Sequence, residues 1–378
     1  MKAPIRPYPM GVLVKTIIKK LWIVMALSAP KILRADELPT NYDPKSETFH
    51  NVEPDLGLNG SFLEMVSASY KILFDNKARI PMVPLPEIKP DLAAFMEPNE
   101  AFQFIWFGHS TLMFKIDEVV VLVDPVFSSN ASPTKFLTKR FQPSVLKLEE
   151  MPAVDAIIIS HDHYDHLDAE TVTYFAQKGT KFIVPSKMGG LLEGWGVDRK
   201  NIVELNWGES FALGTLNFTA TVAHHTSGRG ILDQRKTLWA SWVLRGKSQS
   251  IFYSGDTAYK GHFKAIGEKY GPFDYAFIEN GQYDVKWPDA HMQPEESVQA
   301  ALDVKAKAFI PVHWGMFDLA LHHWSEPVVR SSKIAHDKGL TFLSPRLGER
   351  VDTHHLQTFS PWWEDVLQKE DELRRKGK

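Results

Sequence analysis

The chain of 378 residues carries a net charge of −3, contains no cysteine, and is 44% apolar and 12% aromatic. This length and apolar content are sufficient for one large α/β domain or for two ordinary ones. The lack of cysteine excludes disulfide bonds and thiolate metal ligands, and the nearly balanced charge, without a long basic run, argues against a nucleic-acid-binding face.

The first 35 residues differ from the rest of the chain. Several lysines precede the short apolar run 21–29, which ends in small residues, with Ala26 and Ser28 at a candidate cleavage site. This order is typical of a secretory signal, and the run is shorter than the ~20 apolar residues of a membrane-spanning helix. We expect residues 1–35 to be a signal-like or membrane-anchoring leader on a membrane-associated or exported protein, on the periplasmic side in a bacterium. An amphipathic leader on a cytoplasmic protein is the alternative.

The next segment, residues 36–98, is rich in proline and charge, with one candidate helix over residues 61–74. We expect it to be an N-terminal wrap packed on a main domain of residues 99–378. That domain begins with two predicted strands, 102–114 and 119–123, because both are rich in apolar and β-branched residues.

The strongest pattern in the chain is a run typical of a buried strand, 156–159, followed at once by imidazoles and carboxylates. His161 and His163 point the same way in an extended segment, with Asp165 in the same alternation and His166 facing elsewhere. One loop could therefore offer two histidines to one cation and an Asp–His pair to a second. Histidine is a favoured metal ligand and rarely clusters in this way without a cation, so a merely solvated, charged loop is the weaker interpretation.

The run 161–166, His-Asp-His-Tyr-Asp-His, resembles the His-x-His-x-Asp-His signature of the metallo-β-lactamase-fold hydrolases. Neighbouring words resemble the branch containing N-acylphosphatidylethanolamine-hydrolysing phospholipase D, and the resemblance extends from about residue 41 to about residue 363. It implies a four-layer αβ/βα sandwich with metals at one edge, where periodicity alone indicates only the α/β class. Within this resemblance, His109 and Asp124 lie at the ends of opening strands, where both could support the metal site from behind. A lone histidine is more often a satisfied core residue, so we expect His109 to be structural and Asp124 to be a support rather than a ligand.

A predicted strand over residues 216–223 ends at His224 and His225, and only one of these neighbours can face a metal. Residues 223–230, Ala-His-His-Thr-Ser-Gly-Arg-Gly, resemble the family pattern Ala-Gln-His-x-Ser-x-Arg-Gly. This register favours His225 as the ligand and leaves His224 as the alternative. Asp256 lies in a word similar to the family's Gly-Asp-Thr segment, and a carboxylate beside a glycine is well suited to bridging two cations.

Three further short sequence motifs follow along the chain. Residues 279–283, Glu-Asn-Gly-Gln-Tyr, stand where the family carries an Ile-Gly-Ala-Tyr word, which leaves the substrate side of the site open. His291 precedes a predicted helix and matches a histidine near the family's catalytic centre, where it donates a proton or binds phosphate. Hydrogen bonding at the helix start is the alternative. A predicted strand over residues 307–312 ends at His313, which in the family completes the metal coordination.

The resemblance thus implies two divalent ions, of which Zn²⁺ is favoured by nitrogen and oxygen ligation without sulfur, with Mn²⁺ or Fe²⁺ as alternatives. One ion would take His161, His163 and His225, and the other Asp165, His166 and His313, with Asp256 between them and with Asp165 and His291 as catalytic residues.

Such a site predicts a dinuclear metal-dependent hydrolase, a phosphodiesterase of the phospholipase D type acting on N-acylphosphatidylethanolamine-like lipids. The expected partners are a phospholipid or another small anionic substrate and a membrane surface, without nucleic acid. The alternatives are a lactonase or another hydrolase of a small substrate and, from a different class, a non-catalytic metal-binding envelope or regulatory protein. The sequence does not indicate the oligomeric state.

Overall fold

The computed structural model describes residues 41–57, 62–74, 79–98, 101–134, 136–247, 249–355 and 358–377. The predicted leader, residues 1–35, lies outside these ranges. None of the helices in the described ranges is both long and apolar enough to span a bilayer.

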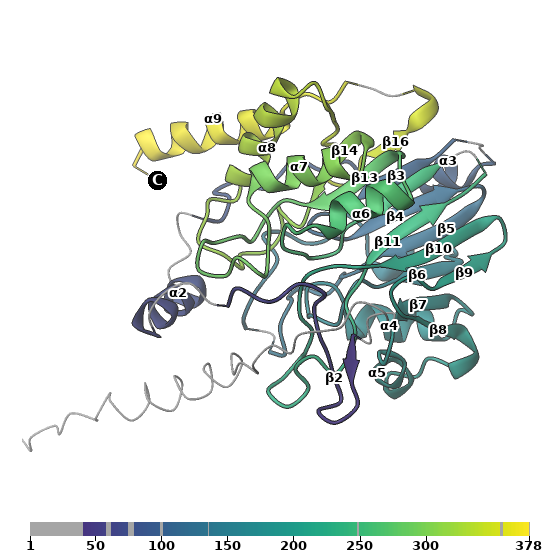
Figure 1. Ribbon diagram of the computed structural model, residues 1–378. Helices are drawn as coiled ribbons and strands as arrows, with labels where there is room; N and C mark the ends of the chain where they lie inside the picture. The colour runs from purple at the N-terminus through teal and green to yellow at the C-terminus, as the bar shows by residue number, and fades with distance from the viewer. Residues whose placement is uncertain are drawn as a thin grey trace, which may run out of the picture.

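Two mixed seven-stranded sheets form the centre of the molecule (Figure 1). The first sheet has the order β16 (Arg350–Asp352), β3 (Gln103–Trp106), β4 (Leu112–Ile116), β5 (Val119–Val123), β6 (Ala156–Ile158), β7 (Lys181–Pro185) and β8 (Ile202–Leu205). The second has the order β15 (Thr341–Phe342), β14 (Ala306–Val312), β13 (Phe273–Glu279), β12 (Ser250–Tyr253), β11 (Ser241–Arg245), β10 (Leu216–Thr221) and β9 (Ser210–Leu213). In each sheet antiparallel strands on one side give way to parallel strands on the other.

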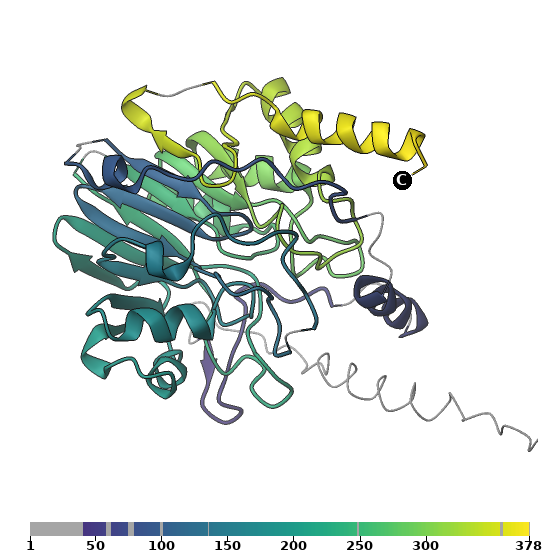
Figure 2. The same ribbon diagram turned by 180° about the vertical axis from the view of Figure 1, so that it is seen from behind.

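Helices cover the outer faces of both sheets, as the two opposite views show (Figures 1 and 2). The first sheet is covered by α3 (Leu92–Met96), α4 (Ala169–Ala176) and α5 (Gly189–Gly194), and the second by α6 (His262–Lys269), α7 (Pro294–Asp303) and α8 (Glu326–Asp337). The other helices within the described ranges are α2 (Phe62–Phe74), α9 (Trp362–Arg375) and three short 3-10 turns, η2 (Leu148–Glu150), η3 (Arg199–Asn201) and η4 (Thr353–His355).

Strand alternation explains this layering. Ile158 packs into the core between the two sheets, whereas its neighbour Ile157 packs outward against the helices. Adjacent strand residues point to opposite faces, and a strand apolar on both faces is therefore buried on both. The layers are thus helix, sheet, sheet, helix, which confirms the predicted four-layer αβ/βα sandwich.

One strand was predicted to be longer than it is. Residues 102–114 form two strands, β3 and β4, because the chain turns back between them at Gly108 and His109, with φ of +96° and +52°. Residues 108–111, Gly-His-Ser-Thr, interrupt the apolar run at this turn, and the single predicted strand passed over them. The turn places His109 at the end of the hairpin.

The segment 41–57 contains the hairpin of β1 (Tyr42–Asp43) and β2 (Thr48–Phe49) and contacts loops that follow β8, β10 and β12. Phe49 is buried against Leu238 and Trp239, and the Asn41 amide exchanges hydrogen bonds of 2.8 and 3.1 Å with Asn206. These contacts hold the segment on the residues that we expected to form the main domain.

Candidate metal centre

The predicted site residues emerge from strand ends along one edge of the sandwich. Residues 161–166 follow β6, Asp256 follows β12, and His313 follows β14 directly. The carboxyl ends of parallel strands meet at one edge of a sheet, and turns after buried strands can direct side chains into a shared space. Gly255 shows how closely these turns approach: its φ is +57°, and a Cβ there would lie 2.6 Å from the Cβ of Ser160.

His161, His163 and His225 form the first group of candidate ligands. Nδ1 of His163 lies 2.8 Å from Nε2 of His161 and 3.4 Å from Nε2 of His225. The other ring nitrogen of His225 lies 3.0 Å from the carbonyl oxygen of Ala290, which fixes the ring with Nε2 toward the group.

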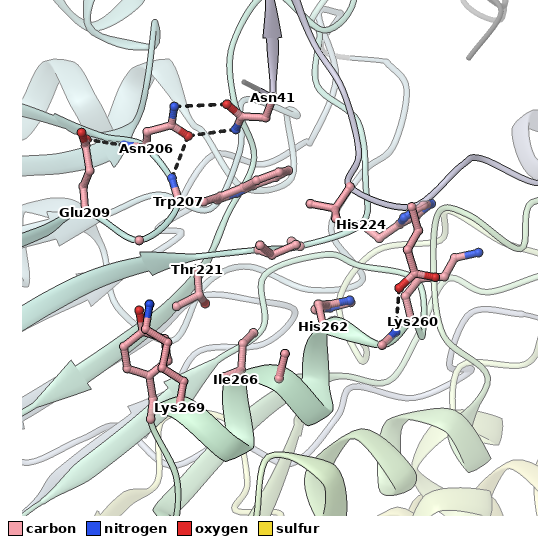
Figure 3. A pocket seen from close by; sticks show the side chains of 18 residues that line it. Asn41, Asn206, Trp207, Glu209, Thr221, His224, Lys260, His262, Ile266 and Lys269 are labelled. Atoms are coloured by element: carbon pink, nitrogen blue, oxygen red, sulfur yellow. Dashed lines mark hydrogen bonds between the residues drawn. The ribbon is translucent and has the colours of Figure 1, made fainter. Parts of the chain in front are cut away.

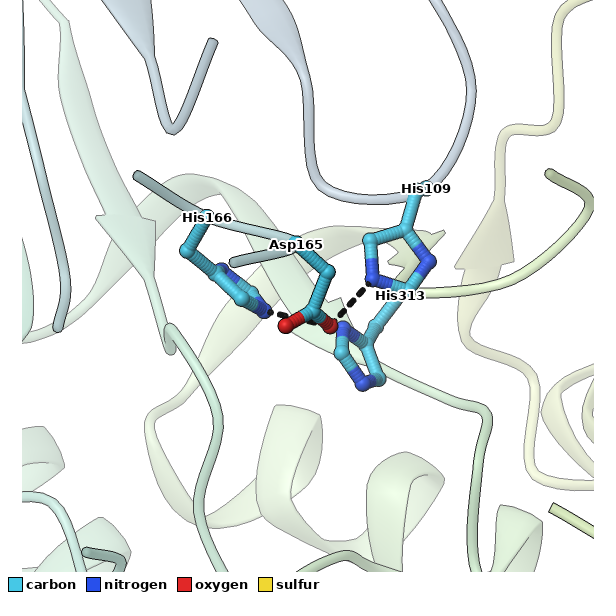
Figure 4. A group of neighbouring side chains, drawn as sticks. All are labelled: His109, Asp165, His166 and His313. Atoms are coloured by element: carbon cyan, nitrogen blue, oxygen red, sulfur yellow. Dashed lines mark hydrogen bonds and ion pairs between the residues drawn. The ribbon is translucent and has the colours of Figure 1, made fainter. Parts of the chain in front are cut away.

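The second group consists of His109, Asp165, His166 and His313 (Figure 4). Oδ2 of Asp165 lies 2.8 Å from Nε2 of His109 and 3.4 Å from Nε2 of His166. The structure thus brings His313 to the side of Asp165 and His166. It also adds His109, which we had placed behind the site.

Asp256 lies between the two groups. Its Oδ2 is 3.1 Å from Nε2 of His166 and 3.8 Å from Nε2 of both His161 and His225. Its Oδ1 is 3.1 Å from Nδ1 of His313. One carboxylate therefore reaches histidines of both groups, which is the arrangement that a bridging ligand requires.

Burial shapes the electrostatics of these groups. It raises the pKa of Asp256 to about 7, and it lowers the pKa of His161, His225 and His313 well below the usual histidine value. Burial also acts to lower the pKa of His166, but the charges of Asp256, Asp165 and Asp124 outweigh it and raise that pKa well above the usual value. The histidines of the first group are thus kept in the neutral form that binds metal.

These residues fit divalent cations. Nε2 of His166, Nε2 of His313 and Oδ1 of Asp256 are buried and have no hydrogen-bond partner among the described residues. Buried polar atoms without a partner cost free energy, and three such atoms beside one another are satisfied together by cations.

Asp124 supports this arrangement from behind. Its Oδ2 accepts a hydrogen bond of 2.7 Å from Nδ1 of His166, and its carboxylate also accepts bonds from the backbone and hydroxyl of Ser160 and from the hydroxyl of Tyr253. A proton held on Nδ1 leaves Nε2 of His166 free for a cation.

His224 points away from both groups. Its Nε2 lies 3.3 Å from Asp55 and 3.4 Å from Asp289, and the residue lines a cavity of about 680 Å³ together with His262 and Ile266 (Figure 3). Because neighbouring side chains project in different directions, the structure turns His225, and not His224, toward the candidate ligands.

His291 lies at the edge of the second group, with its ring stacked on that of His313 at 4.8 Å between centroids. Its Nδ1 lies 2.7 Å from Oε2 of Glu279, a fully buried carboxylate at the end of β13. Sequence reasoning did not single out Glu279. The available signal was an acidic residue directly after a buried apolar strand, where a charge needs partners.

Comparisons with known proteins agree with this geometry. A family model described as Beta-lactamase superfamily domain matches residues 120–314. An uncharacterized protein of Mycobacterium tuberculosis is 37% identical over 90% of this chain and 94% of its own length. N-acyl-phosphatidylethanolamine-hydrolyzing phospholipase D 1 of Caenorhabditis elegans is 37% identical over 59% of this chain and 66% of its own length. The structure of Igni18, a metallo hydrolase of Ignicoccus hospitalis, shares the fold with a TM-score of 0.53 at 20% identity, covering 69% of this chain and 100% of that one.

Proposed function

The chain belongs to the beta-lactamase superfamily and is a metal-dependent hydrolase, and from this premise we propose that it is a phosphodiesterase that hydrolyses N-acylphosphatidylethanolamine-like lipids. The observation that carries the proposal is the convergence of nitrogen and oxygen donors from distant segments on one edge of the sandwich. We assign His161, His163 and His225 to one cation, Asp165, His166 and His313 to the other, and Asp256 to both.

The proposed reaction is attack of water on phosphorus. The bond between phosphorus and the oxygen of the N-acylethanolamine breaks, phosphatidic acid forms, and the proton lost by the water ends on the leaving oxygen. Divalent cations held by these residues, Zn²⁺ by preference for this donor set, would lower the pKa of a bound water and stabilise charge on the phosphoryl oxygens.

Two side chains act on protons in this scheme. Asp165, held by His109 at 2.8 Å, accepts a hydrogen bond from the attacking water and orients it. His291, whose Nδ1 lies 2.7 Å from Oε2 of Glu279, faces the leaving side and delivers the proton to the leaving oxygen from Nε2.

A lipid substrate is supported by the loops that surround the site. Leu232, Val285 and Phe136 are 90%, 69% and 84% exposed, and each belongs to a loop next to a site segment. The Leu232 loop is held to the histidine motif by Arg229, which donates to the carbonyls of Asp162 and Leu167. Large exposed apolar side chains beside a site are suited to a membrane surface. The C. elegans relative is named for the hydrolysis of an N-acylated phospholipid, and the match covers 59% of this chain and 66% of the relative's length.

The test combines metal analysis with a substrate panel. We expect the purified protein to hold two equivalents of metal and to release phosphatidic acid from vesicles that contain N-acylphosphatidylethanolamine. His163→Ala should lose metal and activity together, since its Nδ1 lies closest to the other two histidines of its group. Rapid opening of lactones without release of phosphatidic acid would overturn the proposal in favour of a lactonase.

A further inference from the structure

Glu279 is the carboxylate on which this inference is based. It ends β13, has no exposed surface, and lies beside His291 at the edge of the candidate metal centre. A carboxylate buried in this way is costly unless several donors satisfy it. Its partners therefore indicate what it does.

Three donors satisfy the two oxygens of Glu279. Oε1 accepts hydrogen bonds from the backbone nitrogens of Thr257, at 3.0 Å, and Met292, at 3.2 Å. Oε2 lies 2.7 Å from Nδ1 of His291. Thr257 directly follows Asp256, and Met292 directly follows His291. The Glu279 carboxylate at the end of β13 therefore binds both the turn that carries Asp256 and the loop that carries His291.

The bond to Nδ1 decides the state of the imidazole. Oε1 of Glu279 already accepts from two backbone nitrogens, and we infer that Oε2 accepts from Nδ1 of His291, which places the proton of the ring on Nδ1. The neutral ring then has its lone pair at Nε2, and the charged ring has a proton there that faces the substrate side. The ring orientation is fixed at the same time, because Nδ1 cannot turn away without leaving a buried carboxylate without its partner.

We propose that Glu279 is a positioning residue for His291: it holds Nδ1 of the ring and thereby directs Nε2 at the leaving oxygen of the substrate. This inference rests on the proposed phosphodiesterase function. Glu279 lies within reach of a cation shared with Asp256, His291 and His313, but both of its oxygens already have partners among the three donors, so we assign it to the support of His291.

The substitution Glu279→Gln tests this with little change of shape. The amide oxygen can still accept from Thr257 and Met292, but the amide nitrogen then faces Nδ1 of His291 and donates to it. The proton of the neutral ring therefore moves to Nε2, and the charged ring loses its partner. Glu370 offers a matched control, since it is also fully buried and accepts from the backbone of Met82 and from Trp324, but lies on α9.

The kinetic readout uses two substrates that differ in their leaving group. An alkoxide such as that of N-acylethanolamine needs a proton to leave, whereas p-nitrophenolate leaves without one. We expect Glu279→Gln to lower kcat on N-acylphosphatidylethanolamine by roughly 10²–10⁴-fold with little change in KM. On bis(p-nitrophenyl) phosphate the loss should be far smaller. Glu370→Gln should affect both substrates equally and weakly, and adding Glu279→Gln to His291→Ala should cause no further loss.

A second readout does not depend on activity. Nitrogen-15 NMR of histidine-labelled, metal-loaded protein should show the His291 proton on Nδ1 in the parent chain and on Nε2 in Glu279→Gln. A proton on Nε2 in the parent chain would overturn the inference, as would equal losses on the two substrates or loss of a metal equivalent from Glu279→Gln. If the parent chain hydrolysed no phosphodiester, the proposed function would fail, whereas the NMR result would still decide the role of Glu279.

Discussion

Asp124 shows how far the candidate metal centre depends on a residue outside the two ligand groups. The substitution Asp124→Asn places an amide where Nδ1 of His166, Ser160 and Tyr253 all donate. The amide nitrogen cannot accept a hydrogen bond, so at least one of these donors loses its acceptor. His166 then no longer has an acceptor that holds its proton on Nδ1 and leaves its Nε2 free for a cation. We expect metal affinity to fall about 10–100-fold, the usual effect of losing such a support, as measured by competition with a chelator.

Asp274→Asn is the matched control for this prediction. Asp274 lies near the opposite end of β13, where it accepts from the backbone of Ser250 and pairs with Lys307. Its substitution should leave metal affinity unchanged. Equal affinities for the parent chain and Asp124→Asn would show that His166 does not depend on Asp124.

His322 makes the stability of the chain depend on pH. Its Nε2 accepts a bond of 2.8 Å from the backbone of Gln282, so the ring is held neutral, and burial lowers its pKa from 6.5 to about 4. Between these two values the unfolded chain binds the proton and the folded chain does not, so stability is lost as the pH falls. We expect a loss on the order of 1 kcal/mol per pH unit in this window.

The variant His322→Gln isolates this contribution. Its amide oxygen can accept from Gln282 but binds no proton, and the other titrating groups are common to both proteins. Urea unfolding measured from pH 7 to about 5 should therefore give a shallower loss of stability for the variant. Parallel curves for the two proteins would contradict the assignment.

Among single residues, sequence analysis identified those that stand in a recognisable short motif. Histidines at 161, 163 and 166 stand out because they cluster directly after a buried strand, and the structure brings them together with His225, Asp256 and His313. The role of Asp124 as a support was also expected. Glu279 and His322 could not be found in this way, because their partners lie 12 and 40 residues away in the sequence and only the folded loops bring them into contact.

Among the elements, the segment 41–57 has a direct connection to the first ligand group. The amide of Asn51 donates to the carbonyl of His225 at 2.9 Å and accepts from its backbone nitrogen at 3.1 Å. The same oxygen accepts from Nε1 of Trp239. We therefore propose that this segment is part of the site and not only a cover for the main domain.

The substitution Asn51→Ala leaves the buried backbone of His225 without these partners, which costs about 1–3 kcal/mol for each unsatisfied group. We expect a lower melting temperature and a metal affinity reduced by about tenfold, because His225 then loses its fixed backbone position. Calorimetry with and without added metal measures both effects.

Asn206→Ala provides the comparison. It removes the amide pair with Asn41 and so loosens the same segment at a point remote from His225. This variant should lose stability without losing metal affinity. A loss of affinity equal to that of Asn51→Ala would mean that the whole segment, rather than the Asn51 contact, holds the site together.

The elements themselves were predictable where they are buried on both faces. Apolar runs predicted β5, β6 and β14 closely, because central strands of a sandwich have no polar face. The turn at Gly108 and His109 was missed because the apolar residues on its two sides were taken as one run, although residues 108–111, Gly-His-Ser-Thr, interrupt it. Register and strand order come from pairing between distant segments, and no local pattern carries that information.

For the whole molecule, the family resemblance predicted the four layers of the sandwich. It did not predict the surface around the candidate metal centre. Three loops there carry exposed Leu232, Val285 and Phe136, and we define these residues as the apolar rim. Each loop is anchored beside the site: the Phe136 loop, for example, places Phe141 on the backbone of Met316, close to His313. Exposed apolar side chains on loops that are anchored beside a site are suited to contact with a membrane surface.

The double substitution Leu232→Ser and Phe136→Ser tests the apolar rim. Burying a large apolar side chain in the membrane interface is worth roughly 1.5–3 kcal/mol, so losing two should weaken vesicle binding by at least about tenfold. Hydrolysis of vesicle-bound N-acylphosphatidylethanolamine should fall in parallel, and turnover of soluble bis(p-nitrophenyl) phosphate should not change. Val329→Ser, at an exposed apolar residue on α8, is the control and should leave vesicle binding intact. Flotation of the double variant with vesicles at the parent level would mean that the rim does not bind membranes, and the lipid would then have to reach the metals by another route.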